Sequence, residues 1–139
     1  MPTHEEGTKM NWGYLFLSME GRINRKPFWL AVVVLVVISL IASILDLVLH
    51  TPRFGATDTN AGEGPIAAIV SLIMIYPSIA LSAKRWHDRN KSAWWILINI
   101  IPVIGWIWSL VETGFLRGTD GPNRFGPDPL TNGLMVAAE

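Results

Sequence analysis

Three long runs of apolar residues constrain this chain more than any other feature of its sequence. The first covers residues 28–49, a stretch of 22 positions in which only Asp46 is charged. At about 1.5 Å per residue, a helix of this length extends roughly 33 Å, enough to cross the hydrocarbon core of a bilayer. The run is longer than the core of a signal peptide and follows 27 other residues. We therefore interpret it as a retained transmembrane helix.

The second apolar run covers residues 65–83 and contains no charged side chain. Pro65 suits the first turn of a helix, because the N–H that proline lacks would have no partner there. Pro77 lies late in the run, where it removes a backbone hydrogen bond and predicts a kink. We expect a second transmembrane helix over this range, separated from the first by a polar, glycine-rich loop.

The third apolar run, residues 93–116, is interrupted near its middle by Asn99, Pro102 and Gly105. A single kinked transmembrane helix is the topology that we expect here. The alternative is that the run turns back as two short half-helices. A turn at that depth would need cover from other helices or subunits, because lipid offers no hydrogen bonds to free backbone groups.

Composition places the chain among membrane proteins and excludes several kinds of site. Half of its 139 residues are hydrophobic and only 16% are charged, which is little charge for the surface of a soluble domain. The formal net charge is zero, so nothing indicates nucleic-acid binding. The chain has no cysteine and its three histidines are scattered, so we expect no metal site and no cofactor.

The segments outside these runs complete an all-α polytopic fold, one membrane domain over residues 1–139. Residues 11–20 carry an apolar stripe at helical spacing, which predicts a short amphipathic helix in the membrane interface. The stripe consists of Trp12, Leu15, Phe16 and Met19. Residues 84–92 are expected to form a charged cytoplasmic loop, and residues 117–139 a tail rich in glycine and proline.

The positions of the basic residues predict which side of the membrane each segment faces. With three crossings, the N-terminal segment and the Lys84–Lys91 loop share one side and hold 8 of the 11 Lys and Arg residues. Because cytoplasmic loops carry the excess of Lys and Arg, we expect both segments to be cytoplasmic and the C-terminus to lie outside. If the third run turns back, the tail becomes cytoplasmic and the division is 10 against 1.

The most charged stretch, KRWHDRNK, lies between the second and third runs and has two interpretations. It can be a hinge between membrane helices, with Lys84 and Arg85 paired to Asp88 at helical spacing. In that hinge, an interfacial aromatic belt would contain Trp86, Trp94 and Trp95. It can also belong to a site for an anionic lipid headgroup or other ligand, because arginine binds phosphate through two parallel hydrogen bonds. The candidate residues of that site are Arg22, Arg25, Arg85, His87, Asp88 and Arg124.

Catalysis is not predicted from this stretch. No activated nucleophile is evident, and the neighbouring side chains of His87 and Asp88 point in different directions on a helix. The remaining polar residues favour structural roles. Asn99 is expected to bridge helices rather than line a pore. Asp46 and Glu112 are expected near the outer face, solvated at the interface rather than binding an ion.

Four motifs occur in a fixed order: GRINRKPFW (21–29), KRWHDRNKSAWW (84–95), IPVIGW (101–106) and GTDGPNRFGPDP (118–129). With this combination the chain resembles the DUF805 family of small bacterial inner-membrane proteins over nearly its whole length. The family pattern has an Arg-Arg-Leu-His-Asp run, in which this chain has Lys84 and Trp86 at the first and third places. The resemblance implies a bacterial cytoplasmic membrane location and no known reaction. Besides the candidate site residues, the matching positions are Gly21, Trp29, Ser92, Trp94, Trp95, Pro102, Gly105, Asn123, Gly126 and Pro127.

These features favour a small integral membrane protein that is not an enzyme and acts by association with itself, with anionic lipid or with an unknown membrane partner. Asn99 and the prolines in the apolar runs leave polar backbone that neighbouring subunits could cover, which favours a homo-oligomeric accessory or scaffold protein. The alternative is a small oligomeric channel or transporter, whose broken helices would form a site at the membrane midplane. A lipid-modifying enzyme is disfavoured, because no nucleophile, metal set or acid–base pair is recognisable.

Overall fold

The computed structural model describes residues 10–54 and 62–130, and nearly all regular structure in these ranges is helical. Apart from two isolated β-bridges, this part of the chain contains no strand. The elements in chain order are α1 (Trp12–Leu17), α2 (Arg25–Val48), α3 (Pro65–Asp88), the 3₁₀-helix η1 (Ala93–Ile100), α4 (Ile104–Leu110) and the single π-helical turn η2 (Val111–Phe115). The all-helical class predicted from the sequence is confirmed for the described residues.

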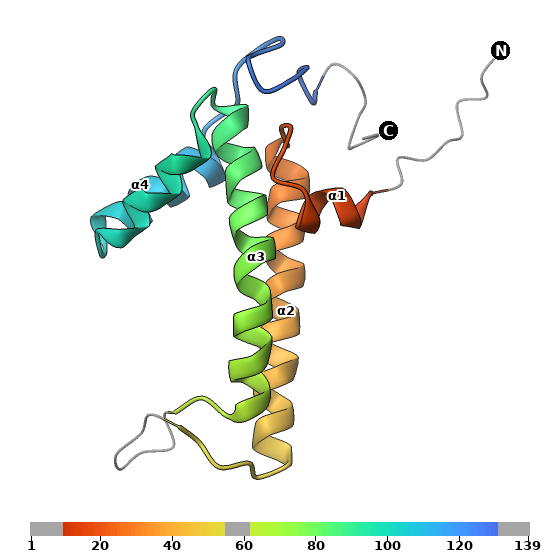
Figure 1. The fold of residues 1–139 in the computed structure, drawn as a ribbon, viewed down its shortest axis with the longest axis vertical. Helices are drawn as coiled ribbons and strands as arrows, with labels where there is room; N and C mark the ends of the chain where they lie inside the picture. Colours follow the sequence, from red (N-terminus) through yellow and green to blue (C-terminus); the bar gives the residue numbers. More distant parts are fainter. Residues whose placement is uncertain (1–9, 55–61, 131–139) are drawn as a thin grey trace, which may run out of the picture.

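Two long helices, α2 and α3, run side by side in opposite directions and form the axis of the molecule (Figure 1). Each has 24 residues, and each is long and apolar enough to cross a membrane. Only 17% of the most apolar window of each helix is buried inside the protein, whereas the core helix of a soluble protein would be mostly buried. Exposed aliphatic surface of this extent requires an apolar solvent, and lipid supplies one.

The helix bounds agree closely with the first two predicted spans. α2 begins three residues before the predicted position 28 and ends one residue before position 49. α3 starts at Pro65 as expected and continues through Pro77 without ending. It also continues to Asp88, so the predicted loop over residues 84–92 is wrong for its first five positions, which form the last turn of the helix.

Asp46 joins the far ends of the two helices. Its carboxylate accepts hydrogen bonds from the backbone N–H groups of Ile66 (3.2 Å) and Ala67 (2.7 Å). These are orphan donors of the first turn of α3, so Asp46 of α2 caps its neighbour. The side chain is only 3% exposed, and the expectation that it is solvated at the interface is therefore wrong. Gly64 leaves room for the carboxylate, since a Cβ there would lie 2.2 Å from its Cγ.

The third apolar run is folded back on itself. η1 ends at Ile100, the chain reverses over residues 101–103, and α4 packs mainly against η1 and η2. Gly105 permits this close return, because a Cβ there would lie 1.9 Å from the carbonyl oxygen of Ile98. The Trp106 Nε1–H donates to the Asn99 carbonyl oxygen at 2.9 Å. The structure thus has the two short half-helices of the alternative, and a third complete crossing is not confirmed.

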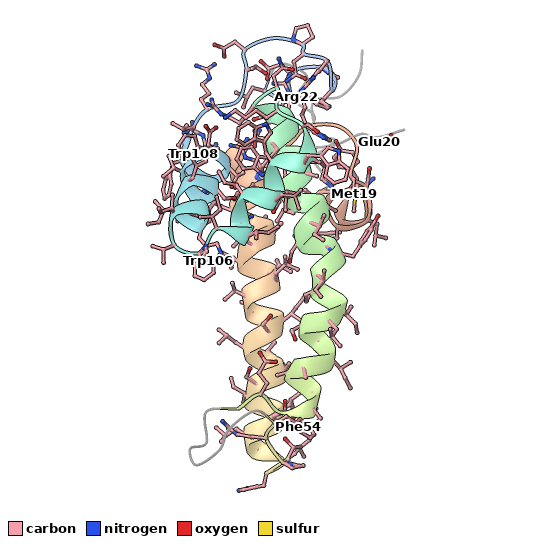
Figure 2. All side chains as sticks on the ribbon, turned by 60° about the vertical axis from the view of Figure 1, so that its left-hand side comes forward. Met19, Glu20, Arg22, Phe54, Trp106 and Trp108 are labelled. Carbon is pink, nitrogen blue, oxygen red and sulfur yellow. The ribbon has the colours of Figure 1, made fainter. Side chains whose placement is uncertain are left out.

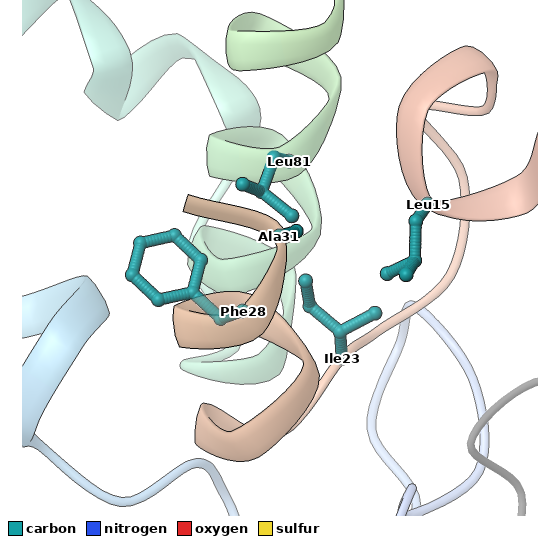
Figure 3. Close-up of a cluster of buried hydrophobic side chains, with 5 residues drawn as sticks. All are labelled: Leu15, Ile23, Phe28, Ala31 and Leu81. Atoms are coloured by element: carbon teal, nitrogen blue, oxygen red, sulfur yellow. The ribbon is translucent and has the colours of Figure 1, made fainter. Parts of the chain in front are cut away.

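The hydrophobic core lies at the end of the α2–α3 pair where α1 packs. Its buried side chains come from α1, α2, α3 and the segment before α2, namely Leu15, Ile23, Phe28, Ala31 and Leu81 (Figure 3). α1 is held there by Tyr76 of α3, whose hydroxyl donates to the Leu17 carbonyl oxygen at 2.8 Å. A helix therefore exists within the predicted range 11–20, and its location in a membrane interface stays a prediction.

Candidate functional site

Most of the charged side chains lie at one end of the α2–α3 pair, which we call the charged end. Figure 2 places Arg22 there, at the opposite end of the helix pair from Phe54. The last turn of α3 supplies Lys84, Arg85 and Asp88, whose exposed fractions are 0%, 0% and 3%. Ionised groups cost several kcal/mol each to bury unless they are partnered. The partners of these side chains therefore determine what this end of the molecule can do.

Asp88 binds two arginines at once. The Arg22 Nε donates to Asp88 Oδ1 at 3.1 Å, and the Arg85 Nη1 donates to Oδ2 at 2.5 Å. Residues 22 and 88 are 66 positions apart in the chain. We call Arg22, Arg85 and Asp88 the clasp. The pairing of Arg85 with Asp88 at helical spacing, predicted from the sequence, is confirmed.

The remaining donors of the clasp arginines bind backbone carbonyl groups from other segments. Arg22 donates from Nη2 to Thr119 at 2.6 Å, and from Nη1 to Gly121 at 2.7 Å and Gly126 at 3.3 Å. Arg85 donates to the carbonyl oxygens of Ile23 (3.0 Å), Thr113 (2.6 Å) and Leu116 (3.0 Å). The clasp thereby fixes the N-terminal segment, the end of the third run and the first part of the tail onto α3.

Lys84 has a different partner from the one expected. Its ammonium group donates to the carbonyl oxygens of Tyr14 (2.6 Å), Leu15 (2.7 Å) and Ser18. These carbonyls belong to α1 and the residue that ends it, where helical carbonyls lack intrahelical partners and attract cations. The predicted pairing of Lys84 with Asp88 is wrong. The ammonium group binds three carbonyl oxygens instead, and the Asp88 carboxylate is shared by the two clasp arginines.

His87 and Arg124 lie beside the clasp but outside it. The His87 ring stacks on Phe125 with centroids 4.0 Å apart, and its Nδ1 is 3.2 Å from the Gly21 carbonyl oxygen. Arg124 lies over the same Phe125 ring and donates to the Asn90 carbonyl oxygen at 3.3 Å. His87 and Asp88 thus have separate partners, so the structure does not join them as an acid–base pair.

A second ion group closes the base of the folded-back third run. Glu112 accepts from Arg89 Nε at 3.0 Å and from Lys91 Nζ at 2.7 Å. The expectation that Glu112 is solvated near the outer face is wrong, because the reversal of the chain returns it to the charged end. Sequence reasoning missed this pairing, although charges flanking an apolar run on both sides are a signal for such a hairpin.

One of the three tryptophans assigned to the interfacial aromatic belt is buried inside the protein. Trp86 is 0% exposed and stacks on Trp95, so its assignment to an interfacial belt is wrong. It is buried because the last turn of α3 packs under η1. Trp94 is 77% exposed and Trp95 is 44% exposed, which leaves both available to lipid.

The residues carried over from the family resemblance occupy two places. Around the clasp, Gly126 accepts from Arg22, and Asn123 Nδ2 donates to the His87 carbonyl oxygen at 2.9 Å. At the hairpin, Pro102 lies in the reversal and Gly105 permits it, while the Trp29 Nε1–H donates to the Gly114 carbonyl oxygen at 3.0 Å.

A cavity of about 300 Å³ lies beside the clasp, between the start of α2 and the tail. Three cations line it, Arg25, Lys26 and Arg117, together with the carboxylates of Asp88 and Asp128. Of these five, Lys26, Arg117 and Asp128 were not among the site residues predicted from the sequence. The sequence indicated a role for these three residues only weakly, because isolated charges next to an apolar run are usually solvated.

Asp128 is buried and accepts hydrogen bonds at this cavity. The backbone N–H groups of Leu130 and Gly121 donate to it, each at 2.9 Å. These bonds, with the nearby charges of Arg22 and Arg117, hold the pKa of Asp128 below its ordinary value despite its burial. Within residues 10–54 and 62–130, no group of three or more His, Asp or Glu side chains could hold a metal ion.

Comparison with known proteins identifies the family. Residues 16–127 match the family described as "Protein of unknown function (DUF805)". The inner membrane protein YhaH of Escherichia coli K12 is 36% identical over 114 residues, which cover 82% of this chain and 88% of YhaH. The inner membrane protein YhaI of the same organism is 30% identical over 115 residues, covering 82% and 87%. No solved structure matches. The chain therefore belongs to the DUF805 family, whose function is unknown.

Proposed function

We propose that the protein is an accessory protein of the bacterial inner membrane that acts by association, and that copies of it associate through the hairpin of η1 and α4. The two apolar helices and the relatives named as inner membrane proteins support the location. One observation carries the proposal. The hairpin extends sideways from the α2–α3 pair, and a single copy of the chain leaves much of it without cover (Figure 1).

The exposed side chains of the hairpin are large and apolar. Trp94, Ile100 and Ile104 are 77%, 76% and 69% exposed, the highest values among the large hydrophobic side chains of the described residues. A groove of about 470 Å³ between α4 and the following η2 turn could receive side chains of a second copy. It is lined by Ile104, Ile107, Trp108, Val111, Glu112 and Leu116.

The reversal of the hairpin adds a requirement that lipid does not meet. η1 has eight residues, which reach at most about 16 Å at roughly 2 Å per residue. That is about half of the ~30 Å hydrocarbon core, so the irregular backbone at residues 101–103 would lie within it. Such backbone is tolerated at membrane depth only where protein or enclosed water covers it. A neighbouring copy of the chain is the simplest cover.

We also propose that the charged end faces the cytoplasm. Of the 11 Lys and Arg residues, only Arg53 lies in the connection between α2 and α3 at the other end. The other ten precede α2, lie in its first turn or follow Ala83, and among them Lys9 lies outside the described residues. This bias is strong by the positive-inside rule. It corresponds to the topology in which both terminal segments are cytoplasmic, rather than the one with the C-terminus outside.

The same hairpin favours a second candidate function, a small oligomeric channel or transporter. Half-helices that meet within the membrane are the usual means of building a midplane site. Asn99 near the reversal would be its polar lining. Liposome flux assays distinguish the two functions: a channel gives flux that Asn99→Leu abolishes, whereas an accessory protein gives none for any common ion or solute.

Disulfide cross-linking in native membranes tests the association. The chain has no cysteine, so each introduced thiol is the only one. Ile104→Cys places a thiol on the hairpin, and Val36→Cys places a matched control thiol on the exposed surface of α2, where Val36 is 51% exposed. We expect a cross-linked dimer with Ile104→Cys under mild oxidation and little with Val36→Cys. Equal yields at the two positions, or no dimer at Ile104, would overturn the proposal.

A further inference from the structure

We propose that the cavity beside the clasp binds a phosphate group, carried either by an anionic phospholipid or by a soluble phosphate compound. This inference goes beyond the proposed self-association and does not depend on it, because the cavity and the η1–α4 hairpin are formed by different residues. The cavity measures about 300 Å³. That lies at the lower end of the ~300–1,000 Å³ range of small-ligand sites, a size that suits a headgroup or small phosphate ester.

Two cations at the cavity have donors to offer. Lys26 is exposed and makes no side-chain hydrogen bond or ion pair within the described part of the chain, so all three ammonium protons are available. Arg25 donates from Nη1 to the Phe115 carbonyl oxygen at 2.9 Å. Its other guanidinium N–H groups have no partner among the described residues, and a guanidinium fork matches two phosphate oxygens.

The third cation is at the rim. Arg117 lines the cavity and pairs with Asp120 at 2.6 Å, with the two side chains 63% and 74% exposed. An ion pair so exposed is worth only about 0–1 kcal/mol, so a phosphate could compete for the arginine. Because Arg117 lies at the start of the tail and Lys26 at the start of α2, the cavity presents cations from two segments.

The carboxylates at the cavity already have partners. Asp88 is bound by both clasp arginines, and Asp128 accepts two backbone N–H groups near Arg22 and Arg117. Counted together with the ion-pair partners of Asp88 and Arg117, the charged groups at the cavity are five cations and three carboxylates: Arg22, Arg25, Lys26, Arg85 and Arg117 against Asp88, Asp128 and Asp120. The surplus is positive. The first turn of α2 also begins at this cavity, so the positive end of its dipole adds to the attraction for an anion.

The site's place in the molecule is compatible with both sources of phosphate. Arg25 and Lys26 are the first residues of α2, where the helix enters the apolar region, and this is the level of lipid headgroups. The tail residues Gly118 and Thr119 also line the cavity, and the tail lies beyond the charged end of the helix pair (Figure 1). A soluble phosphate compound could therefore reach the same cations from the water side.

The test uses the full-length protein in nanodiscs and one matched pair of variants. Lys26→Gln removes a cation that lines the cavity, and Arg124→Gln removes a cation from the same end that does not. Lipid binding is measured by native mass spectrometry in phosphatidylcholine discs with and without phosphatidylglycerol. Soluble binding is measured in pure phosphatidylcholine discs by titration with glycerol 3-phosphate and with inorganic phosphate.

We expect Lys26→Gln to weaken binding about tenfold, the loss of one charge-assisted hydrogen bond, and Arg124→Gln to leave it within about twofold. Binding of phosphatidylglycerol alone would identify the lipid as the source, and binding of glycerol 3-phosphate in pure phosphatidylcholine would identify a soluble compound. If no probe binds, or if the two variants weaken binding equally, the cavity is not a phosphate site. Neither failure would affect cross-linking at Ile104, which tests the self-association separately.

Discussion

Replacing Asp88 by asparagine removes the one negative charge that two buried arginines share. Arg22 and Arg85 have side chains only 1% and 0% exposed, so neither guanidinium can turn to water without unfolding part of the charged end. Removing one partner of a buried ion pair costs about 3–5 kcal/mol, because the remaining charge is left uncompensated. Since folded proteins are stable by only about 5–15 kcal/mol, a loss of this size is large.

The tail should respond first to this change. Arg22 binds three tail carbonyls, at Thr119, Gly121 and Gly126, and Asp88 holds Arg22 in place. Thermal unfolding in nanodiscs reports the loss of stability, and trypsin cleavage after Arg117 or Arg124 reports release of the tail. We expect Asp88→Asn to lower the unfolding temperature and to speed cleavage strongly.

The matched control is Asp120→Asn, which removes the same charge from an exposed pair with Arg117. Its expected cost is below about 1 kcal/mol, and cleavage by trypsin at Arg124 should stay slow. If the two variants had equal, small effects and the tail stayed protected in both, the clasp would not hold the tail, and the reasoning from burial would be refuted.

Three further predictions concern single residues. Asp46→Ala should cost about 0.5–2 kcal/mol in thermal unfolding, since it removes the cap of α3. Gly118→Ala should destabilise the charged end, because its Cβ would meet Asp88 Oδ2 at 2.0 Å, whereas Gly13→Ala has space and should not. The ionised Asp128 carboxylate stabilises the folded state at pH values above the ordinary carboxyl pKa. This stabilisation is lost as the pH falls through the lowered pKa that Asp128 has in the folded protein. The hydrogen-exchange protection factors of residues 121–130, which correct for the intrinsic pH dependence of exchange, should therefore fall in acid, and Asp128→Asn should remove this pH dependence.

Periodicity and length predicted the parts of the fold that local chemistry determines. The apolar runs located α2 and α3 within a few residues, since a continuous apolar helix needs no information from the rest of the chain. The spacing of Arg85 and Asp88 predicted their ion pair for the same reason. The third run was harder, because Asn99, Pro102 and Gly105 are compatible with both a kink and a reversal.

The contacts that sequence reasoning missed join segments far apart in the chain. A helical i, i+4 pair stabilises a helix by only about 0.2–0.5 kcal/mol, which is too little to keep Lys84 paired with Asp88. Its ammonium group binds carbonyl oxygens of α1 instead, about seventy residues away in the chain. Whether Glu112 pairs with Lys91 or is solvated at the outer face depends on the reversal of the chain between these two residues. Arg22 and Arg25 were assigned to one anionic site, yet the structure commits Arg22 to the clasp and leaves Arg25 at the cavity. These outcomes depend on tertiary packing.

The third apolar run turns back, so that the tail lies at the same end of the molecule as the N-terminal segment. Cysteine accessibility in intact cells tests it directly. Single cysteines replace Pro122 in the tail, Glu20 before α2, and Phe54 in the connection at the other end, each probed with a membrane-impermeant maleimide. We predict labelling at position 54, and protection at positions 20 and 122 until the cells are lysed. Labelling of position 122 together with 54, while position 20 stays protected, would show a third complete crossing and contradict the reversal of the third run.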